Sequence, residues 1–318
     1  MIAAQDIENF LNLLAAGLLT GAIYGLMCVG LSVIFGVMRV INFAQGEFMM
    51  LGMYMALGAF LFLSNAGFGD AAPFIAALLA GIPIFLLGIA LHKTLVSRVT
   101  GLGGTALQGE GHYAQLILTL GISLILANGG LVVFGSAPVS ISTPLSSMSW
   151  GEGALPLGDN VLLFINRGQT IAAVVAIAVV IAFALFMARS RLGRSLRAAA
   201  DNPRAAIYMG VDVDRAYRLA FGFGVGITAI GGGLLASSYP FQPYVGIEYV
   251  IVMYAGVVLG GLGSLRGAFF GGLTIGLVQQ LSALILPNQL QNTAIFVVFL
   301  LIVLIRPEGL FGRAARRA

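Results

Sequence analysis

The sequence predicts an all-α, polytopic integral membrane protein with about eight or nine transmembrane helices and one short cytoplasmic helix. Hydrophobic residues make up 59% of the 318 residues and charged residues only 9%, whereas about a quarter of a typical soluble domain is charged. The mean hydropathy is +1.01, and apolar runs of about 20 residues, enough to cross a bilayer, recur along the chain. We therefore expect a single transmembrane domain over residues 1–318.

The first apolar run, residues 10–37, carries Gly17, Gly21 and Gly25 at intervals of four, so they share one helical face. Small residues in this pattern let two helices approach closely in lipid, and we expect this face to pack against another span. The number of membrane-spanning helices is eight, and not nine, if the glycine-rich stretch 260–267 enters the membrane only partly. Further spans are expected at residues 48–63, 73–91, 113–134, 170–187 and 219–238, at residues 250–286 as two hinged pieces, and at residues 293–305.

A polar break separates the first two spans. Asn42, Gln45 and Glu47 interrupt the apolar sequence, and such a segment is too polar to face lipid. It is either a tight cytoplasmic turn, with Glu47 at the positive end of the second helix, or part of a solute pathway. Hydroxyl and amide groups in later spans are either pathway groups or helix-packing groups, and neutral groups can relay a zwitterion without trapping it. The candidate pathway residues are Asn42, Gln45, Glu47, Thr119, Ser123 and Gln242.

A densely charged stretch follows the fifth span. Seven arginines lie in residues 188–218, and positive charge beside a span marks the cytoplasmic side, so the loop 189–214 is expected in the cytosol. Within it Asn202 supplies a cap, Pro203 the first helical position and Gly210 a stop. Together they predict about two turns of helix at the membrane surface.

The short cytoplasmic helix admits two interpretations. An ordinary basic connection would fix the topology and touch nothing, whereas a capped helix with small side chains is suited to seat against another protein. In the second case Arg197 and Arg204 would offer charge-assisted contacts to acidic groups, and the alanines would let the backbone sit close. The candidate docking residues are Arg197, Asp201, Asn202, Pro203, Arg204, Ala205, Ala206 and Gly210.

The distribution of charge also predicts the orientation of the chain. Basic residues after the third, fifth and last spans mark cytoplasmic ends, which places the N-terminus outside and the C-terminus inside. The loop 135–168 is expected outside. The aromatic segment 239–249 is expected in an interface belt.

Several kinds of chemistry are excluded. The only lysine, Lys93, does not stand in the G-x-x-x-x-G-K context of a nucleotide-binding loop, and there is no H-E-x-x-H or C-x-x-C motif. The single cysteine, Cys28, permits no disulfide framework. His92 and His112 are expected at the surface and not as ligands. The sequence shows no nucleophile and base within reach of each other, as an intramembrane enzyme would need. The net charge of +4 lies in the loops and the tail, so nucleic acid is not an expected partner.

The spans hold almost none of the charged groups that mark ion sites or proton relays. A polar but weakly charged route without an energy source of its own favours a permease driven by another subunit. An ion-coupled carrier or a channel is the alternative from another class.

Five segments in order resemble the membrane subunits of bacterial ABC importers for branched-chain amino acids, specifically the smaller, LivH-like permease. The resemblance covers nearly the whole chain, and the order of the segments makes it specific. The segments are residues 17–52, which end in MRVINFAQGEFMMLG, residues 118–129 (LTLGISLILANG), residues 197–214 (RAAADNPRAAIYMGVDVD), residues 260–277 (GGLGSLRGAFFGGLTIGL) and residues 306–312 (RPEGLFG).

The resemblance implies a multi-pass, non-catalytic permease of the bacterial inner (plasma) membrane whose helix within residues 197–210 docks on a cytoplasmic ATPase. It implies as partners a second, LivM-like permease, two ATPase subunits that bind ATP and magnesium, an external (periplasmic) solute-binding protein and membrane lipid, with no cofactor in this chain. The implied solute is a branched-chain or other hydrophobic amino acid. Similar permeases serve urea, short amides or aromatic acids, which are alternatives.

Overall fold

The computed structural model describes residues 2–100, 111–150, 155–156, 162–287, 290–305 and 309. The elements in this part of the chain are helices apart from strands β1 (Leu155–Pro156) and β2 (Leu162–Leu163), which pair antiparallel. The expected all-α fold is confirmed. The helices are α1 (Ile2–Met38), α2 (Gln45–Asn65), η1 (Gly69–Ala71), α3 (Ala72–Leu91), η2 (His92–Val96), α4 (Ser97–Thr100), α5 (Gly111–Phe134), α6 (Pro144–Ser147), α7 (Arg167–Arg189), α8 (Arg191–Asp201), α9 (Pro203–Tyr208), α10 (Val213–Ala236), α11 (Val245–Gly260), α12 (Leu265–Ser282) and α13 (Gln291–Ile305).

The chain is a multi-pass membrane protein. Its described part has six helices that are long and apolar enough to cross a membrane, and two shorter apolar helices, α11 and α13. With α12, these occupy the positions expected for the remaining spans. The six long segments are Asp6–Met38, Gln45–Asn65, Gly69–Val99, Tyr113–Phe134, Arg167–Arg189 and Val213–Ala236.

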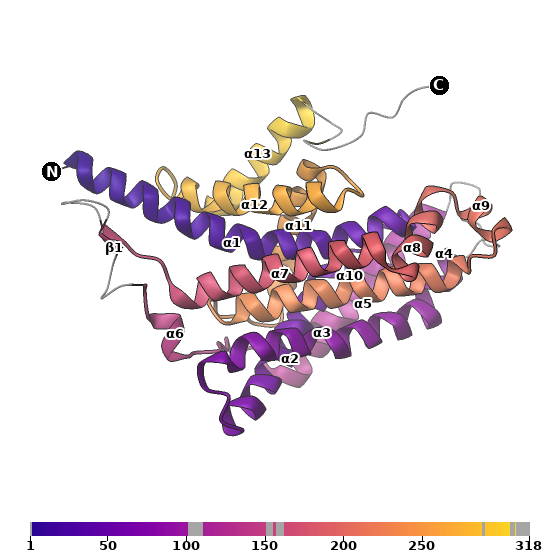
Figure 1. The fold of residues 1–318 in the computed structure, drawn as a ribbon, viewed down its shortest axis with the longest axis horizontal. Helices are drawn as coiled ribbons and strands as arrows, with labels where there is room; N and C mark the ends of the chain where they lie inside the picture. The colour runs from indigo at the N-terminus through magenta and orange to yellow at the C-terminus, as the bar shows by residue number, and fades with distance from the viewer. Residues whose placement is uncertain are drawn as a thin grey trace.

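Most of the long helices run along the long axis of the molecule (Figure 1). The start of α1, α6 and β1 lie at one end, and α4, α8 and α9 lie at the other. Because α8 and α9 carry the arginine-rich stretch, we take their end as cytoplasmic. The start of α1 lies at the opposite end, as the charge pattern predicts. The C-terminal residues 306–308 and 310–318 lie outside the described residues.

The small-residue face of α1 packs against α12. A Cβ atom on Gly21 would lie 2.6 Å from the carbonyl oxygen of Leu273, and a Cβ on Gly25 would lie 2.7 Å from the ring of Phe269. On the other side of the contact, a Cβ on Gly276 would collide with the backbone of Gly21. The predicted close approach is therefore confirmed, and it holds the two ends of the sequence together.

Helix α10 lies at the centre of the bundle, where its glycines admit three neighbours. A Cβ on Gly224 would meet the Gly30 carbonyl oxygen of α1 at 2.7 Å. One on Gly232 would meet the Met49 carbonyl oxygen of α2 at 2.5 Å, and one on Gly233 would lie 2.9 Å from Ala77 of α3. The glycine content of this span thus serves packing on three sides.

Two interruptions of the helices agree with the sequence. Between α1 and α2 the chain turns at Arg39, whose φ is 55°, and Asn42 and Ala44 are fully buried. The polar part of this break therefore lies inside the protein, while Arg39 and Ile41 beside it are exposed. Between α11 and α12 the chain turns at Gly261 and Gly263, with φ values of 99° and 82°, which only glycine adopts without strain.

The segment between α10 and α11 turns back into the bundle. Phe241 exchanges backbone hydrogen bonds of 2.9 Å with Val139, and its ring packs edge-on to Tyr54, which stacks on Phe134 with 3.9 Å between ring centroids. Phe241 is only 2% exposed. The expectation of an interface belt is wrong at this residue, because its ring fills a space among α2, α5 and the external loop.

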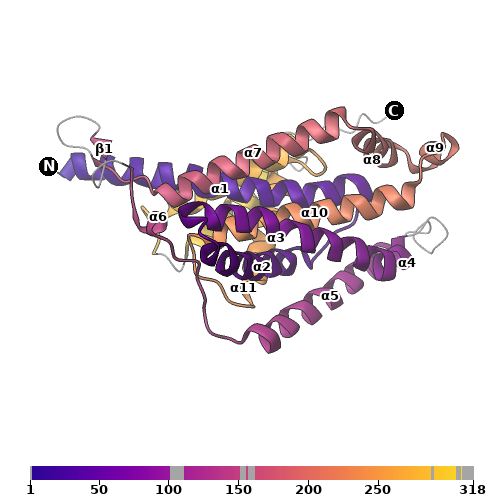
Figure 2. The same cartoon turned by 60° about the horizontal axis from the view of Figure 1, so that its bottom comes forward.

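Helix α5 lies at the edge of the bundle, whereas His92 at the end of α3 is buried in it. Figure 2 shows α5 at the edge, apart from the other long helices. Only 22% of its 18-residue apolar segment is buried. Helix α3 continues through the π-helical turn η2, in which His92 is buried beside Phe221 with 5.9 Å between ring centroids. The expectation of a surface position for His92 is wrong, while the side chain of His112 lies outside the described residues.

Candidate functional site

A chain of hydrogen bonds fills the break between α1 and α2. The Asn42 amide nitrogen donates to Gln45 Oε1 at 2.9 Å, while Asn42 Oδ1 accepts from the Ala44 N–H at 3.2 Å. Gln45 Nε2 donates to the Thr228 hydroxyl of α10 at 2.6 Å and to the Gly224 carbonyl at 3.2 Å. Both amides are fully buried, and buried polar groups need such partners. The network ties the start of α2 to α10.

Glu47 lies in the first turn of α2 and is less well satisfied. Its side chain is 1% exposed, and Oε1 accepts from the Ser123 hydroxyl of α5 at 3.5 Å. Its Oε2 has no hydrogen-bond partner among the residues that the structure describes. A buried acceptor without a donor is unfavourable, so Glu47 is the group of this region best placed to accept a hydrogen bond from a ligand.

The other pathway candidates divide into two kinds. Thr119, one turn before Ser123 on α5, is buried, and its hydroxyl donates to the Ile41 carbonyl at 3.4 Å and to the Leu116 carbonyl at 3.2 Å. Helix α5 thus presents two hydroxyl groups to the break region. Gln242 is exposed, on the segment before α11. The structure gathers five of the six candidates around the start of α2 and leaves Gln242 at the surface.

Two helices begin at this place inside the protein. A Cβ on Gly46 of α2 would collide with the carbonyl oxygen of Gly246 in α11, and a Cβ on Gly246 would lie 2.7 Å from Glu47 Oε2. Helix N-termini carry unpaired N–H groups and partial positive charge, and interrupted helices in transporters direct such ends at anionic groups of the solute. A carboxylate oxygen and two helix N-termini together offer groups for both ends of a zwitterion. We call this region, Asn42, Gln45, Gly46, Glu47, Thr119, Ser123 and Gly246, the interior polar site.

At the cytoplasmic end, α9 is delimited as the sequence predicts. Asn202 Oδ1 accepts from the Ala205 N–H at 3.1 Å, and Pro203 stands at the first helical position. Gly210, with φ of 80°, ends the helix, and its N–H donates to the Ile207 carbonyl at 2.9 Å. The predicted short helix is confirmed, and both of its ends are fixed by hydrogen bonds.

The surface of α9 has a buried side and a protruding tip. Ala206 is only 5% exposed, so its side chain faces the bundle, which differs from the expectation that it meets another protein. Ala205 is exposed. Beyond it Ile207, Tyr208 and Met209 are 44%, 90% and 84% exposed, so an apolar tip stands free at the cytoplasmic end.

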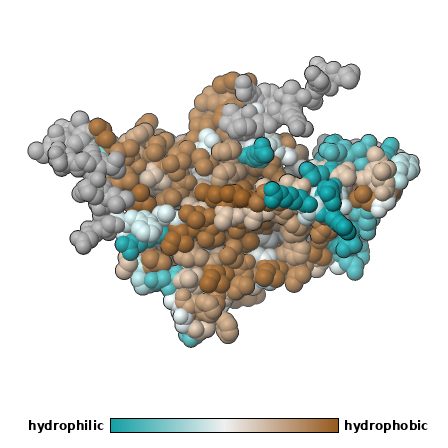
Figure 3. Space-filling model, in the orientation of Figure 1, coloured by the Kyte–Doolittle hydropathy of each residue, from teal (hydrophilic) through white to brown (hydrophobic). Residues whose placement is uncertain are grey.

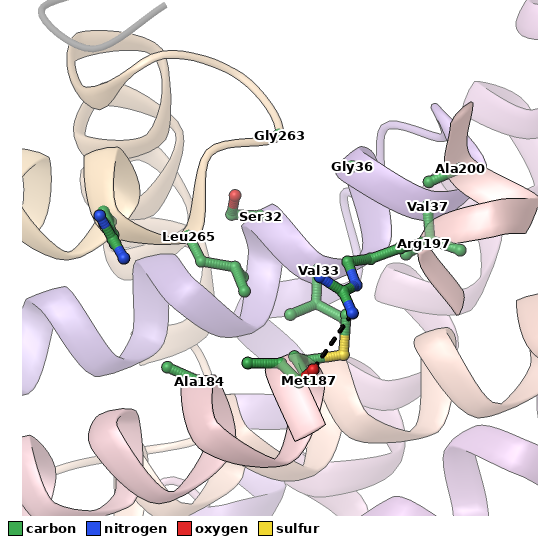
Figure 4. Close-up of a pocket in the computed structure, with 12 residues that line it drawn as sticks. Ser32, Val33, Gly36, Val37, Ala184, Met187, Arg197, Ala200, Gly263 and Leu265 are labelled. Atoms are coloured by element: carbon green, nitrogen blue, oxygen red, sulfur yellow. Dashed lines mark hydrogen bonds between the residues drawn. The ribbon is translucent and has the colours of Figure 1, made fainter. Parts of the chain in front are cut away.

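The charged docking candidates lie on both sides of the cap. Asp201, Arg204 and Gly210 are exposed. Arg197, on α8, is exposed too, but its Nη2 donates to the Ala188 carbonyl at 3.2 Å, as Figure 4 shows. Arg197 therefore turns back toward the end of α7, while Arg204 and Ala205 of α9 are exposed.

Two contributors were not singled out from the sequence. Thr228 is the hydroxyl that receives Gln45, and the signal was a lone threonine in a glycine-rich span. Ser190 caps α8 by accepting from the Gly193 N–H at 2.8 Å, and its signal was a serine directly before an arginine-rich helix. Among the described residues there is no cluster of His, Cys, Asp and Glu that could hold a metal ion.

Comparison with known proteins gives a consistent result. Residues 13–305 match the family model described as "Branched-chain amino acid transport system / permease component". The chain is 30% identical to the high-affinity branched-chain amino acid transport system permease protein BraD of Pseudomonas aeruginosa, over 97% of each chain, and 28% identical to LivH of Escherichia coli K12, over 98% of each. A solved structure, PsaBC from Streptococcus pneumoniae in complex with Fab, aligns over 97% of each chain at 17% identity and a TM-score of 0.46.

Proposed function

The chain belongs to the family of permease components of branched-chain amino acid transport systems, and on this premise we propose that it is the membrane-spanning subunit of an ATP-driven importer. Its solute is a branched-chain or similarly hydrophobic amino acid, which it carries into the cytoplasm. The chain itself is not an enzyme. Two cytoplasmic subunits bind and hydrolyse ATP with magnesium, and a second, LivM-like permease and an external solute-binding protein complete the complex.

The observation that carries this proposal is the tip of α9. The side chains of Tyr208 and Met209 are 90% and 84% exposed. Exposure of such large apolar groups to water is unfavourable unless a partner covers them. The cap at Asn202 and the stop at Gly210 make the helix rigid at both ends, so it can transmit a displacement that a flexible loop would absorb. Exposed Arg204 beside the tip adds charge-assisted contacts to acidic groups of the ATPase.

The interior polar site supports an amino acid as the solute. Glu47 Oε2 is positioned to accept hydrogen bonds from the ammonium group of a substrate. The N-termini of α2 and α11 suit the carboxylate of the same substrate. Urea and short amides lack both charges, so this combination favours a zwitterion over them. Aromatic acids carry the carboxylate but no ammonium group that would match Glu47.

Release of Glu47 requires movement of α5. Ser123 of this helix makes a long hydrogen bond of 3.5 Å to Glu47 Oε1, the one side-chain contact of this carboxylate with a donor among the described residues. Helix α5 is also the least buried of the long apolar helices. We therefore assign to α5 the part of the pathway wall that opens when solute enters.

Reconstitution of the chain in proteoliposomes, alone and with its partner subunits, tests the function. We expect leucine uptake only when the ATPases, the second permease, the loaded binding protein and ATP are all present. Leucine flux through the chain alone would establish the carrier or channel alternative. Equilibrium binding of leucine, urea and an aromatic acid to the partner binding protein tests the solute class separately.

A further inference from the structure

A cavity that shares no lining residue with the interior polar site lies beside the second half of α1. It has a volume of about 280 Å³ and lies between α1, α7, α8 and the loop that joins α11 to α12 (Figure 4). Val33, Val37, Met187 and Leu265 give it apolar walls. It lies near the cytoplasmic end of the bundle, because α7 ends there at Arg189. Transport of an amino acid does not explain it.

One buried hydroxyl in the cavity lacks a partner. Ser32 is 1% exposed, and its Oγ has no hydrogen bond to any residue that the structure describes. A serine within a helix ordinarily bonds to a carbonyl of the preceding turn. Figure 4 shows the Ser32 hydroxyl turned toward the loop that carries Gly263. This hydroxyl therefore has its hydrogen-bonding capacity free for a ligand.

Two arginines, Arg197 and Arg266, are among the residues that line the same cavity, and no acidic residue is. The Nη2 atom of Arg197 donates a hydrogen bond to the Ala188 carbonyl at 3.2 Å. This bond holds the side chain in place and leaves the other N–H groups of the guanidinium available. Arg266 comes from the first turn of α12. Within the part of the chain that the structure describes, neither arginine has an acidic partner. The lining thus includes two cationic residues and one buried hydroxyl.

We propose that this cavity binds the phosphodiester headgroup of an anionic membrane lipid, held by Arg197 and Arg266 and hydrogen-bonded by Ser32. A lipid fits better than a soluble phosphate because the walls are apolar and belong to membrane-spanning helices. Basic pockets between spans on the cytoplasmic side attract anionic headgroups. In Figure 3 the hydrophilic surface over α8 and α9 directly borders the hydrophobic surface of the long helices, as a headgroup site requires.

The bound lipid would connect two parts of the fold. Arg197 lies on α8, which leads into the docking helix α9, and Leu265 and Arg266 follow the glycine turn between α11 and α12. A headgroup between them fixes the position of α8 relative to that turn. The binding itself does not depend on the proposed transport function, so each can fail without the other.

Native mass spectrometry of the purified full chain tests the site, with phosphatidylglycerol titrated against phosphatidylcholine and against soluble glycerol 3-phosphate. We expect the variant R197Q/R266Q to bind phosphatidylglycerol about tenfold more weakly, the effect of losing a charge-assisted hydrogen bond. The matched control is R191Q/R194Q, which removes the same charge from exposed positions of α8 outside the cavity. Phosphatidylglycerol should also raise the Tm of the wild type and the control but not of R197Q/R266Q.

Three outcomes would overturn the proposal. Equal loss of lipid in both double variants would mean a general surface charge effect. Glycerol 3-phosphate binding as tightly as the lipid would mean a site for a soluble anion. Efficient cross-linking of R266C to the second permease, with no lipid retained by the wild type, would mean that the cavity is a subunit interface.

Discussion

Gly46 and Gly246 touch through their backbones where α2 and α11 both begin, 200 positions apart in the sequence. Neither position has room for a methyl group, since a Cβ on Gly46 would collide with the Gly246 carbonyl and one on Gly246 would meet Glu47 Oε2 at 2.7 Å. The crossing brings two helix N-termini and one carboxylate into a single region. The interior polar site depends on it.

Gly46→Ala should destabilise the protein by about 1–3 kcal/mol, because the added methyl group meets backbone atoms that cannot rotate away. The control is Gly58→Ala in the same helix, where no atom lies within 4 Å of the added Cβ, and we expect little change there. Unfolding in mixed micelles measures both. Equal stability of the two variants would contradict the close crossing.

Thr228→Val should weaken the attachment of α2 to α10, because it removes the acceptor for Gln45 Nε2 at 2.6 Å. Hydrogen bonds between membrane helices contribute about 0.6 kcal/mol on average and up to about 1.7 kcal/mol, and we expect a loss in this range. Thr274→Val is the control, since Thr274 donates only to the Phe270 carbonyl of its own helix. Unchanged stability of Thr228→Val would show that Gln45 is held by its other contacts.

Glu47→Gln should raise the KM for leucine uptake by about tenfold, as loss of a charge-assisted hydrogen bond predicts, with little effect on basal ATP hydrolysis. Glu248→Gln, at an exposed position in the first turn of α11, provides a matched control that should transport normally. An unchanged KM together with reduced stability would show that Glu47 serves packing only.

Tyr208→Asp should abolish stimulation of ATP hydrolysis by the loaded binding protein, because it replaces a 90% exposed apolar tip with a charge. Insertion and folding should be normal, since the side chain contacts little of the bundle. Phe68→Asp, also exposed but in the loop between α2 and α3, should leave coupling intact. Full stimulation in Tyr208→Asp would return the loop 189–214 to a signal for topology alone.

Ala205→Arg and Ala206→Arg should behave differently although they are neighbours. Ala205 is exposed, so its variant should fold and fail to co-purify with the ATPases. Ala206 is 5% exposed, so a buried guanidinium should displace α9 and lower thermal stability as well. Equal stability of the two variants would show that α9 is not seated as described.

The sequence predicted those features that depend on local chemistry. The caps at Asn202 and Gly210, the glycine turn before α12 and the packing face at Gly17, Gly21 and Gly25 each follow from what a residue type allows in the backbone or in a close approach. The break after α1 followed from polarity. Its burial did not, because Gln45 is hydrogen-bonded to α10, a helix far along the chain.

The sequence could not show which spans face lipid. In water an apolar face marks the core, but in a bilayer both the core and the lipid side are apolar. Helix α7 has a mean hydropathy of 3.0 and is 28% buried, whereas α10 has 1.8 and is 83% buried. Small residues, and not hydropathy, distinguish the inner helix. The same limit hid the burial of Phe241.

The contact of α1 with α12 has a consequence for biogenesis. Gly21 leaves the ribosome long before Gly276, and with about 250 residues between them at about 5–20 residues per second the delay is on the order of 10–50 s. During that interval the glycine groove of α1 has no α12 to fill it. Lipid chains, the insertion machinery or a membrane chaperone must occupy the groove, and α12 must displace that occupant when it enters the bilayer. A chain truncated before α12 should therefore insert its first spans and remain a substrate for membrane proteases.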